Sequence, residues 1–178
     1  MATSLENIYS IGPTLRSYKF DLSFTRLPDG SPLGTPAREV HLRCLSADVP
    51  SKTGQNITVQ LHGHTLYEPG IYTPSGNLTL TLVETIDLQI SKLIDFLKQC
   101  VWKNNTGVQG DMQSGGQGKD MSFEFILRHL DNQDNTLMGY KLKRCFWNSG
   151  AMPQLSGATP EVYKPQIVIT YTDFEMVD

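Results

Sequence analysis

The sequence of 178 residues has few cysteines, no long apolar run and no excess of charge of one sign. Lysine and arginine number 15 against 18 aspartate and glutamate residues, which gives a formal net charge of -3 at pH 7. Affinity for duplex DNA comes largely from neutralising phosphates with clustered Lys and Arg. A mildly acidic chain without such a cluster is therefore not expected to hold double-stranded nucleic acid tightly.

The apolar segments are too polar for a membrane span. The most apolar window, Ile86–Trp102, is interrupted by Asp87, Lys92, Asp95 and Lys98, whereas a bilayer span requires about 20 predominantly apolar residues. The first residues carry neither a basic leader nor an apolar segment, so we expect no secretory signal. The class that remains is a soluble folded domain long enough for a sizeable core.

The three cysteines, Cys44, Cys100 and Cys145, stand far apart and form no CxxC pair. An odd number at wide spacing, each in an apolar context, predicts buried free thiols. We therefore expect neither a disulfide framework nor a cysteine-based metal site.

Most catalytic signatures are also missing. The chain has no GxSxG motif, and its glycine-rich segment 107–118 lacks the GK[ST] ending of a phosphate loop. The segment Asp131–Asn135 imitates the start of a calcium loop but lacks the later bidentate glutamate, which favours a solvated turn. Phe146 and Trp147 favour core and rim packing over a binding platform. We expect no enzyme and no cofactor.

One pattern points toward a metal. His62 and His64 flank Gly63, and Glu68 follows four residues later. This resembles the first metal motif of cupins, in which alternate histidines on a strand face one side. Cupins carry a glycine six residues before the first histidine, where this chain has Asn56, and their second motif has no counterpart here. We expect these residues to bind no metal.

Period-two alternation of apolar residues predicts several strands. The pair formed by Val40–Ala47 and Asn56–Leu61 is predicted to be antiparallel, and His62–Gly76 is predicted to be a long loop or an extended hairpin. Acidic and amide residues between Leu130 and Leu137 predict a turn joining a second hairpin. The predicted strands are Tyr18–Thr25, Val40–Ala47, Asn56–Leu61, Asn77–Glu84, Met121–Leu130, Leu137–Trp147 and Lys164–Met176.

The period changes to that of a helix over residues 86–102. Apolar residues recur there on one stripe, with Asp87 expected in the first turn and Lys98 near the end, both favourable to the helix dipole. The stripe consists of Ile86, Ile90, Leu93, Ile94, Leu97 and Val101. This is the only helix that the pattern predicts.

The order of elements predicts one domain over residues 1–178, with an N-terminal arm at 1–17 and a core at 18–176. Residues Leu27–Arg38 and Lys103–Asp120 read as irregular surface loops because they are rich in proline or glycine. The predicted fold class is mainly β (α+β), a barrel-like packing of two antiparallel sheets with one flanking helix and long loops.

This order of elements resembles the tail tube proteins of contractile-tailed bacteriophages, which share one structural class with the tube proteins of related secretion and pyocin-type machines. The resemblance covers most of residues 18–176. The segments that carry it are Arg43–Pro50, Ile57–Gly63, Leu78–Glu84, Phe96–Trp102, Tyr140–Trp147, Pro153–Leu155 and Ile167–Glu175.

The resemblance implies a structural subunit, six copies of which form a ring, with rings stacked into a hollow conduit for the viral genome. It implies the tail sheath, the tape-measure protein and the baseplate as partners, and DNA that passes through the lumen without specific binding. The implied location is the tail of the virion, after assembly in the host cytoplasm. Long loops in such a subunit are expected to reach the next ring.

Within His62–Gly76, the amphipathic Tyr67 and Tyr72 and the stiffening Pro69 are the expected inter-ring contacts. Three other functions remain open. They are a tube-initiating or tube-terminating ring protein of the same fold, a small metal-dependent cupin-like enzyme at His62, His64 and Glu68, and a monomeric sandwich that binds carbohydrate or peptide.

Overall fold

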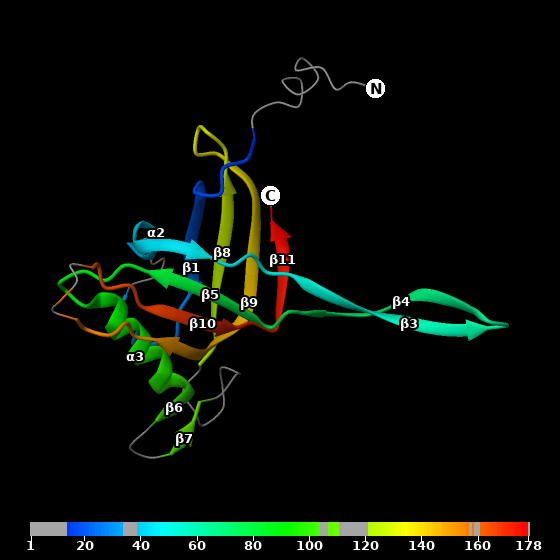
Figure 1. Cartoon of the computed structure of the whole chain (residues 1–178). Coiled ribbons are helices and arrows are strands. Elements are labelled where there is room, and N and C mark those ends of the chain that lie inside the picture. Colours follow the sequence, from blue (N-terminus) through cyan, green and yellow to red (C-terminus); the bar gives the residue numbers. More distant parts are fainter. Residues whose placement is uncertain are drawn as a thin grey trace.

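The computed structural model describes residues 14–33, 39–103, 107–110, 121–156, 158 and 161–177. The protein is mainly β, as predicted, and its core is one seven-stranded antiparallel sheet folded into two layers that share strand β9 (Figure 1). The core strands are β1 (Phe20–Arg26), β2 (Cys44–Ala47), β5 (Asn77–Leu82), β8 (Phe123–Leu130), β9 (Thr136–Ala151), β10 (Gln166–Thr170) and β11 (Asp173–Val177).

The first layer, sheet A, has the strand order β1-β8-β9-β11, and the second, sheet B, has the order β9-β10-β5-β2. Strand β9 passes from one to the other at Arg144, whose φ of 50° marks a local break in the extended backbone. The predicted hairpin of Met121–Leu130 with Leu137–Trp147 is confirmed as β8 and β9.

The core lies between the inner faces of the two sheets. Phe24 of β1 packs against Phe123 and Phe125 of β8, with ring centroids 5.8 and 5.7 Å apart. From sheet B, Ile167 and Ile169 of β10 are fully buried, as their predicted shared face requires. Burial of large apolar side chains contributes about 1.5–3 kcal/mol for each one removed from water.

The predicted C-terminal strand Lys164–Met176 is divided into β10 and β11. Tyr171 leaves the ladder, and its backbone N–H donates to the carbonyl of Gly76 at 2.9 Å. The hydroxyl of Thr172 donates to the carbonyl of Arg144 at 3.4 Å, so this break lies beside the point where β9 changes sheets. The chain therefore moves from sheet B to sheet A at one corner, which alternation alone does not reveal.

The predicted strand Val40–Ala47 and its pairing with Asn56–Leu61 are wrong. Its first part belongs to a one-turn helix, α2 (Glu39–Arg43), and only Cys44–Ala47 is a strand, which pairs with β5. Val40 is buried while Leu42 is largely exposed, so the apolar alternation does not correspond to one strand face. Short apolar runs do not separate a helical turn from a strand.

The helix α3 (Gln89–Val101) begins three residues later than predicted. Residues before it form a turn in which the N–H of Leu88 donates to the carbonyl of Thr85 at 2.9 Å. Leu88 has a φ of 54°, and Ile86 is fully exposed rather than part of the stripe. The buried stripe is formed by Ile90, Leu93, Ile94, Leu97 and Cys100, and it packs against β9.

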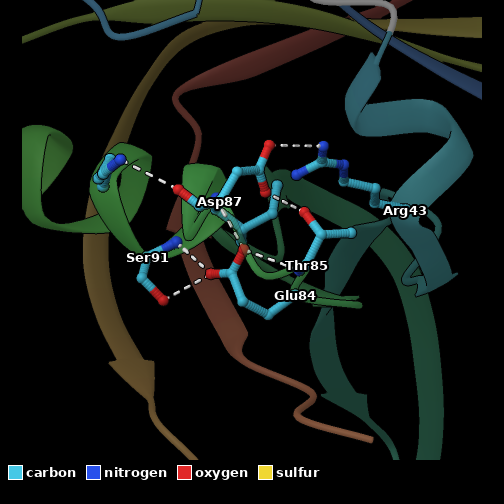
Figure 2. Close-up of polar contacts among 7 residues, drawn as sticks. Arg43, Glu84, Thr85, Asp87 and Ser91 are labelled. Carbon is cyan, nitrogen blue, oxygen red and sulfur yellow. Dashed lines mark hydrogen bonds and ion pairs between the residues drawn. The ribbon is translucent and has the colours of Figure 1, made fainter.

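A buried carboxylate from outside the helix caps α3 (Figure 2). Glu84 accepts hydrogen bonds from the backbone N–H of Ile90 at 3.2 Å and of Ser91 at 2.6 Å, and from the Ser91 hydroxyl at 2.5 Å. Burial raises the pKa of the Glu84 carboxyl, but hydrogen bonds from Ser91, Thr85 and Ile90 outweigh it, so the pKa is lowered overall. Glu84 therefore replaces the first-turn carboxylate that we expected from Asp87.

Asp87 instead connects the turn that precedes α3 with the end of α2. Its carboxylate accepts a hydrogen bond from the Thr85 hydroxyl and lies 3.3 Å from the guanidinium of Arg43, at the end of α2 (Figure 2). The hydrogen bond from Thr85 and the charge of Arg43 hold the pKa of Asp87 below its usual range. This contact fixes the turn 85–88 against α2.

The remaining expectations concern loops and thiols. Residues 27–33 are irregular, as predicted, although Leu27 and Leu33 are buried; residues 34–38, 1–13, 104–106 and 111–120 lie outside the described part of the chain. Short strands β6 (Trp102–Lys103) and β7 (Val108–Gln109) occupy part of the second predicted loop. The three cysteines are free; two are buried and Cys44 is half-buried. Burial raises the pKa of the Cys44 thiol to about 11.

Candidate assembly surfaces

The largest surface feature is a hairpin that leaves the core altogether (Figure 1). Strands β3 (Lys52–Leu61) and β4 (His64–Pro74) pair with each other and with no other described strand. We call residues 52–74 the arm. Its structure selects the extended hairpin over the long loop that the sequence also allowed.

The register of the arm follows from its turn. Leu61 pairs directly with His64, which leaves His62 and Gly63 as a two-residue turn with φ values of 48° and 79°. Two residues at positive φ form the turn type whose twist matches that of paired strands. The arm therefore has one fixed pairing, which decides the side chains that share a face.

One face of the arm is apolar but exposed. Ile57, Val59 and Leu61 of β3 share this face with Leu66 of β4, because the cross-strand pairs are Ile57 with Glu68 and Val59 with Leu66. Ile57 is 52% exposed and Leu61 53% exposed. An isolated hairpin is marginally stable in water at best. The apolar face of the arm is therefore a candidate contact surface.

The predicted contact residues lie on the arm but not all on this face. Tyr67 pairs with Thr58, and Pro69 with Asn56, on the opposite and more polar face. Tyr72 lies near the base, where its ring covers Gly54 so closely that an added Cβ would come within 2.5 Å of it. The face of Ile57, Val59 and Leu61 is not among the predicted contacts, although its alternation is visible in the sequence, because the predicted pairing with Val40–Ala47 places that segment in the core.

The candidate metal residues are spread along the arm. His62 lies in the turn, and His64 and Glu68 are four residues apart on one strand, which is about 13 Å along it. Metal ligands must all lie within about 2.0–2.2 Å of a common ion. No group of three or more His, Cys, Asp or Glu residues in the described part of the chain is arranged to hold a metal.

The base of the arm is tied to the core through Tyr171. The hydroxyl of this buried tyrosine lies 2.6 Å from the hydroxyl of Ser75 and accepts a hydrogen bond from the N–H of Ser51 at 3.3 Å. The N–H of Ser75 donates to the carbonyl of Ser51 at 2.9 Å, which joins the two ends of the hairpin. Lys52 reaches the carboxylate of Asp173 at 3.6 Å. These contacts anchor the arm at the corner between the sheets.

The core itself has open edges. Among the described strands, none pairs with the outer edges of β1 and β11 in sheet A or with the outer edge of β2 in sheet B. Strands β1 and β2 therefore leave the barrel unclosed. A groove of about 410 Å³ lies there, and it is lined by Ser17, Tyr18, Phe20, Leu45, Ser46, Ala47, Val49, Leu127 and His129.

The other polar clusters are local. Asp131 accepts hydrogen bonds from the N–H groups of Gln133 at 2.7 Å and Asn135 at 2.8 Å, and from the Asn135 side chain. It therefore closes the β8–β9 turn with its own neighbours, as the solvated-turn interpretation predicts. Trp147 packs against the core. In the described part of the chain, no helix is both long and apolar enough to cross a membrane.

No protein-family model and no curated protein matches this sequence. Solved structures match over nearly the whole chain. A chain of the sheath/tube terminator of the PVC extracellular contractile injection system matches with a TM-score of 0.64 and 14% identity, covering 94% of this chain and 99% of that one.

Two further matches come from related assemblies. A chain of the anti-feeding prophage baseplate matches with a TM-score of 0.63 and 13% identity, over 93% of this chain and 97% of that one. A chain of the PVC sheath–tube complex matches with a TM-score of 0.59 and 15% identity, over 99% of both chains. The predicted resemblance is thus confirmed at the level of the fold: this chain has the fold of tube, terminator and baseplate components of contractile injection systems.

Proposed function

We propose that this chain is a structural subunit of a contractile-tail tube, and that six copies form a ring that stacks with others into a hollow conduit for DNA. The observation that carries the proposal is sheet A, whose edges β1 and β11 have no partner among the described strands. Open strand edges are templates for pairing with another chain. A subunit of this kind needs no catalytic site, and we propose that residues 1–178 form one such domain.

The strand directions of sheet A suit ring closure. Each neighbouring pair is antiparallel, so β1 and β9 run one way and β8 and β11 run the other. When β11 of one copy lies beside β1 of the next, the antiparallel alternation continues without a break. A ring built in this way leaves no free edge in sheet A.

The arm is the proposed contact between rings. It extends away from both sheets (Figure 1), and its apolar residues Ile57, Leu61 and Leu66 are about half exposed in the single chain. A second copy would remove this surface from water. Tyr67, Pro69 and Tyr72 remain proposed inter-ring contacts on the other face and at the base.

The same proposal includes the tail sheath, the tape-measure protein and the baseplate as partners. It places the assembled protein in the tail of a virion, after assembly in the host cytoplasm. DNA is proposed to pass through the lumen without specific binding.

A second candidate is a ring protein that begins or ends a tube. The support for it is that terminator and baseplate chains match this fold with TM-scores of 0.64 and 0.63, against 0.59 for the sheath–tube complex. A protein of this kind would form single rings, or would dock on a partner, without polymerising.

Negative-stain electron microscopy at rising protein concentration tests both candidates. We expect stacked rings or tubes from the parent, and single rings from a variant with Ile57→Ser and Leu66→Ser, because the apolar face of the arm then keeps only Val59 and Leu61. The matched control is Thr58→Ser with Thr65→Ser, on the opposite face of the same strands, which should polymerise like the parent. A parent that forms only single rings would favour the second candidate, and one that stays monomeric up to millimolar concentration would contradict both.

A further inference from the structure

The outward face of sheet A carries a balanced set of charges. Residues that pair across neighbouring strands share a face, and Asp21 pairs with Arg128, Lys141 with Glu175 and Lys143 with Asp173. In β1, β8 and β9 these positions alternate with buried residues, and in β11 Asp173 and Glu175 flank Phe174, which is partly buried and packs against the core. The charged residues of this face are Asp21, Glu124, Asp173 and Glu175 with Arg26, Arg128, Lys141 and Lys143, four acids and four bases.

Three of the bases lie against carboxylates of neighbouring strands. Arg128 lies 3.2 Å from Asp21, and Lys141 lies 3.7 Å from Glu124. The third contact, from Lys143 to Glu175, is 2.6 Å long.

The Lys143 contact is strong enough to affect its titration. The hydrogen bond to Glu175 raises the pKa of Lys143, and the negative charges of Glu175, Glu124 and Asp173 add to the effect. Lys143 therefore remains charged, but its charge is offset by acids on its own face.

Fold stability does not account for this arrangement. The side chains of Lys141 and Glu124 are 31% and 27% exposed, and those of Lys143 and Glu175 are 41% and 46% exposed. Ion pairs in such positions contribute about 0–1 kcal/mol. The centres of protein interfaces are depleted of charged residues. By the alternation of β8 and β9, the apolar residues Ile126, Leu130 and Leu137 share this face with the eight charged residues, and Val177 of β11 joins them. Charged side chains therefore dominate the face, which lacks the apolar centre of a protein interface and adds little to the stability of the core.

We infer that the outward face of sheet A is a charge-compensated surface over which a polyanion such as duplex DNA moves without being held, and that Glu124 and Glu175 keep it so. Lysine and arginine side chains that neutralise phosphates release the counterions condensed on the DNA, which drives binding, and here Lys141 and Lys143 already have carboxylate neighbours. That this face lines a conduit rests on the proposed function. The charge compensation itself is a property of the single subunit.

The test is binding of a fluorescent 20-base-pair DNA duplex to unassembled subunits, measured by fluorescence anisotropy at several salt concentrations. In the face variant, Glu124→Gln with Glu175→Gln, Lys141 loses its ion pair with Glu124 and Lys143 its ion pair with Glu175, while Asp173 remains opposite Lys143. In the matched control, Asp95→Asn with Glu161→Gln, the net charge changes equally at exposed positions outside sheet A, in α3 and in an irregular segment. Thermal unfolding verifies that both variants remain folded.

We expect the parent and the control to bind the duplex weakly. The face variant should bind about ten-fold more tightly than the control at low salt, and its log–log salt slope should be steeper by about two, because each freed cation adds about 0.9. Equal binding by the face variant and the control would overturn the inference, and so would a parent that binds as tightly as the face variant.

This outcome is separate from that of the assembly experiment. A monomeric parent whose face variant gains DNA binding would contradict the proposed function while leaving the charge compensation intact. A parent that forms tubes but binds DNA as tightly as the face variant would support the proposed function and contradict the charge compensation.

Discussion

The arm and strand β5 have the same sequence pattern but opposite surroundings. Leu78, Leu80 and Leu82 alternate along β5 and are 0–1% exposed, whereas Ile57 and Leu61 alternate along β3 and are 52–53% exposed. Both segments form strands, so the alternation predicts the local structure correctly in each. The comparison teaches that alternation does not identify the covering partner, which for β5 is its own chain and for the arm is proposed to be another copy.

A matched pair of truncations should separate the two regions most clearly. Leu80→Ala removes buried methyl groups and leaves a cavity, so we expect it to lower the free energy of unfolding by about 2–5 kcal/mol. Ile57→Ala, in the arm, should change the free energy of unfolding of the unassembled subunit by no more than about 0.5 kcal/mol. Urea denaturation measures both, and a large loss from Ile57→Ala would mean that the arm packs on its own core.

The effect of Glu84 should be intermediate and should depend on pH. Glu84→Gln replaces a charged cap of α3 by a neutral one, and hydrogen bonds to charged groups contribute about 1.5–3 kcal/mol, so we expect a loss of about 2 kcal/mol at pH 7. The lowered pKa of Glu84 means that this stabilisation is fully present above the unfolded value of about 4.3. It is lost as the pH falls through the lower folded value.

Unfolding of the parent and of Glu84→Gln, measured from pH 7 to pH 3, tests whether the stabilisation by Glu84 is lost as the pH falls. The difference between the two proteins should shrink toward acid pH. A constant difference would show that Glu84 acts through packing rather than through its charge. The arm, which has no such cap, should contribute nothing to the difference.

A smaller effect than that of Glu84→Gln is expected at Tyr171, where the two regions join. Tyr171→Phe removes the hydroxyl that contacts Ser75 and Ser51, and a net contribution of about 1 kcal/mol is typical of such hydrogen bonds. Hydrogen exchange should become faster at the amides of Ser51 and Ser75 while the amides of β10 keep their protection. Unchanged exchange at both serines would mean that the arm is anchored elsewhere.

The parts of the fold that the sequence predicts are those decided by neighbouring residues. The β8–β9 hairpin was predicted because its turn residues lie between two alternating segments, and α3 because its stripe is continuous from Ile90 to Leu97. The start of α3 was missed because Glu84 caps it from six residues before Ile90, at a spacing outside the usual capping pattern.

The errors lie where distant segments decide the structure. The partner of β2 is β5, and the break at Tyr171 depends on Gly76, nearly a hundred residues away. The inter-ring contact at this hairpin stays a prediction; it names Tyr67 but not Ile57, although Ile57 lies on the apolar face. Register decides which face each residue occupies, and register followed from the two-residue turn at His62 and Gly63.

The central place of β10 determines the order in which the fold can be completed during synthesis. β10 lies between β9 and β5, so β5 waits for one of its two neighbours until residues 166–170 have left the ribosome. At synthesis rates of about 5–20 residues per second, β5 has β2 as its only sheet neighbour for several seconds, until β10 has been synthesised. During that interval sheet A also lacks β11. The nascent chain therefore cannot present both edges of sheet A to a growing assembly until the fold is nearly finished.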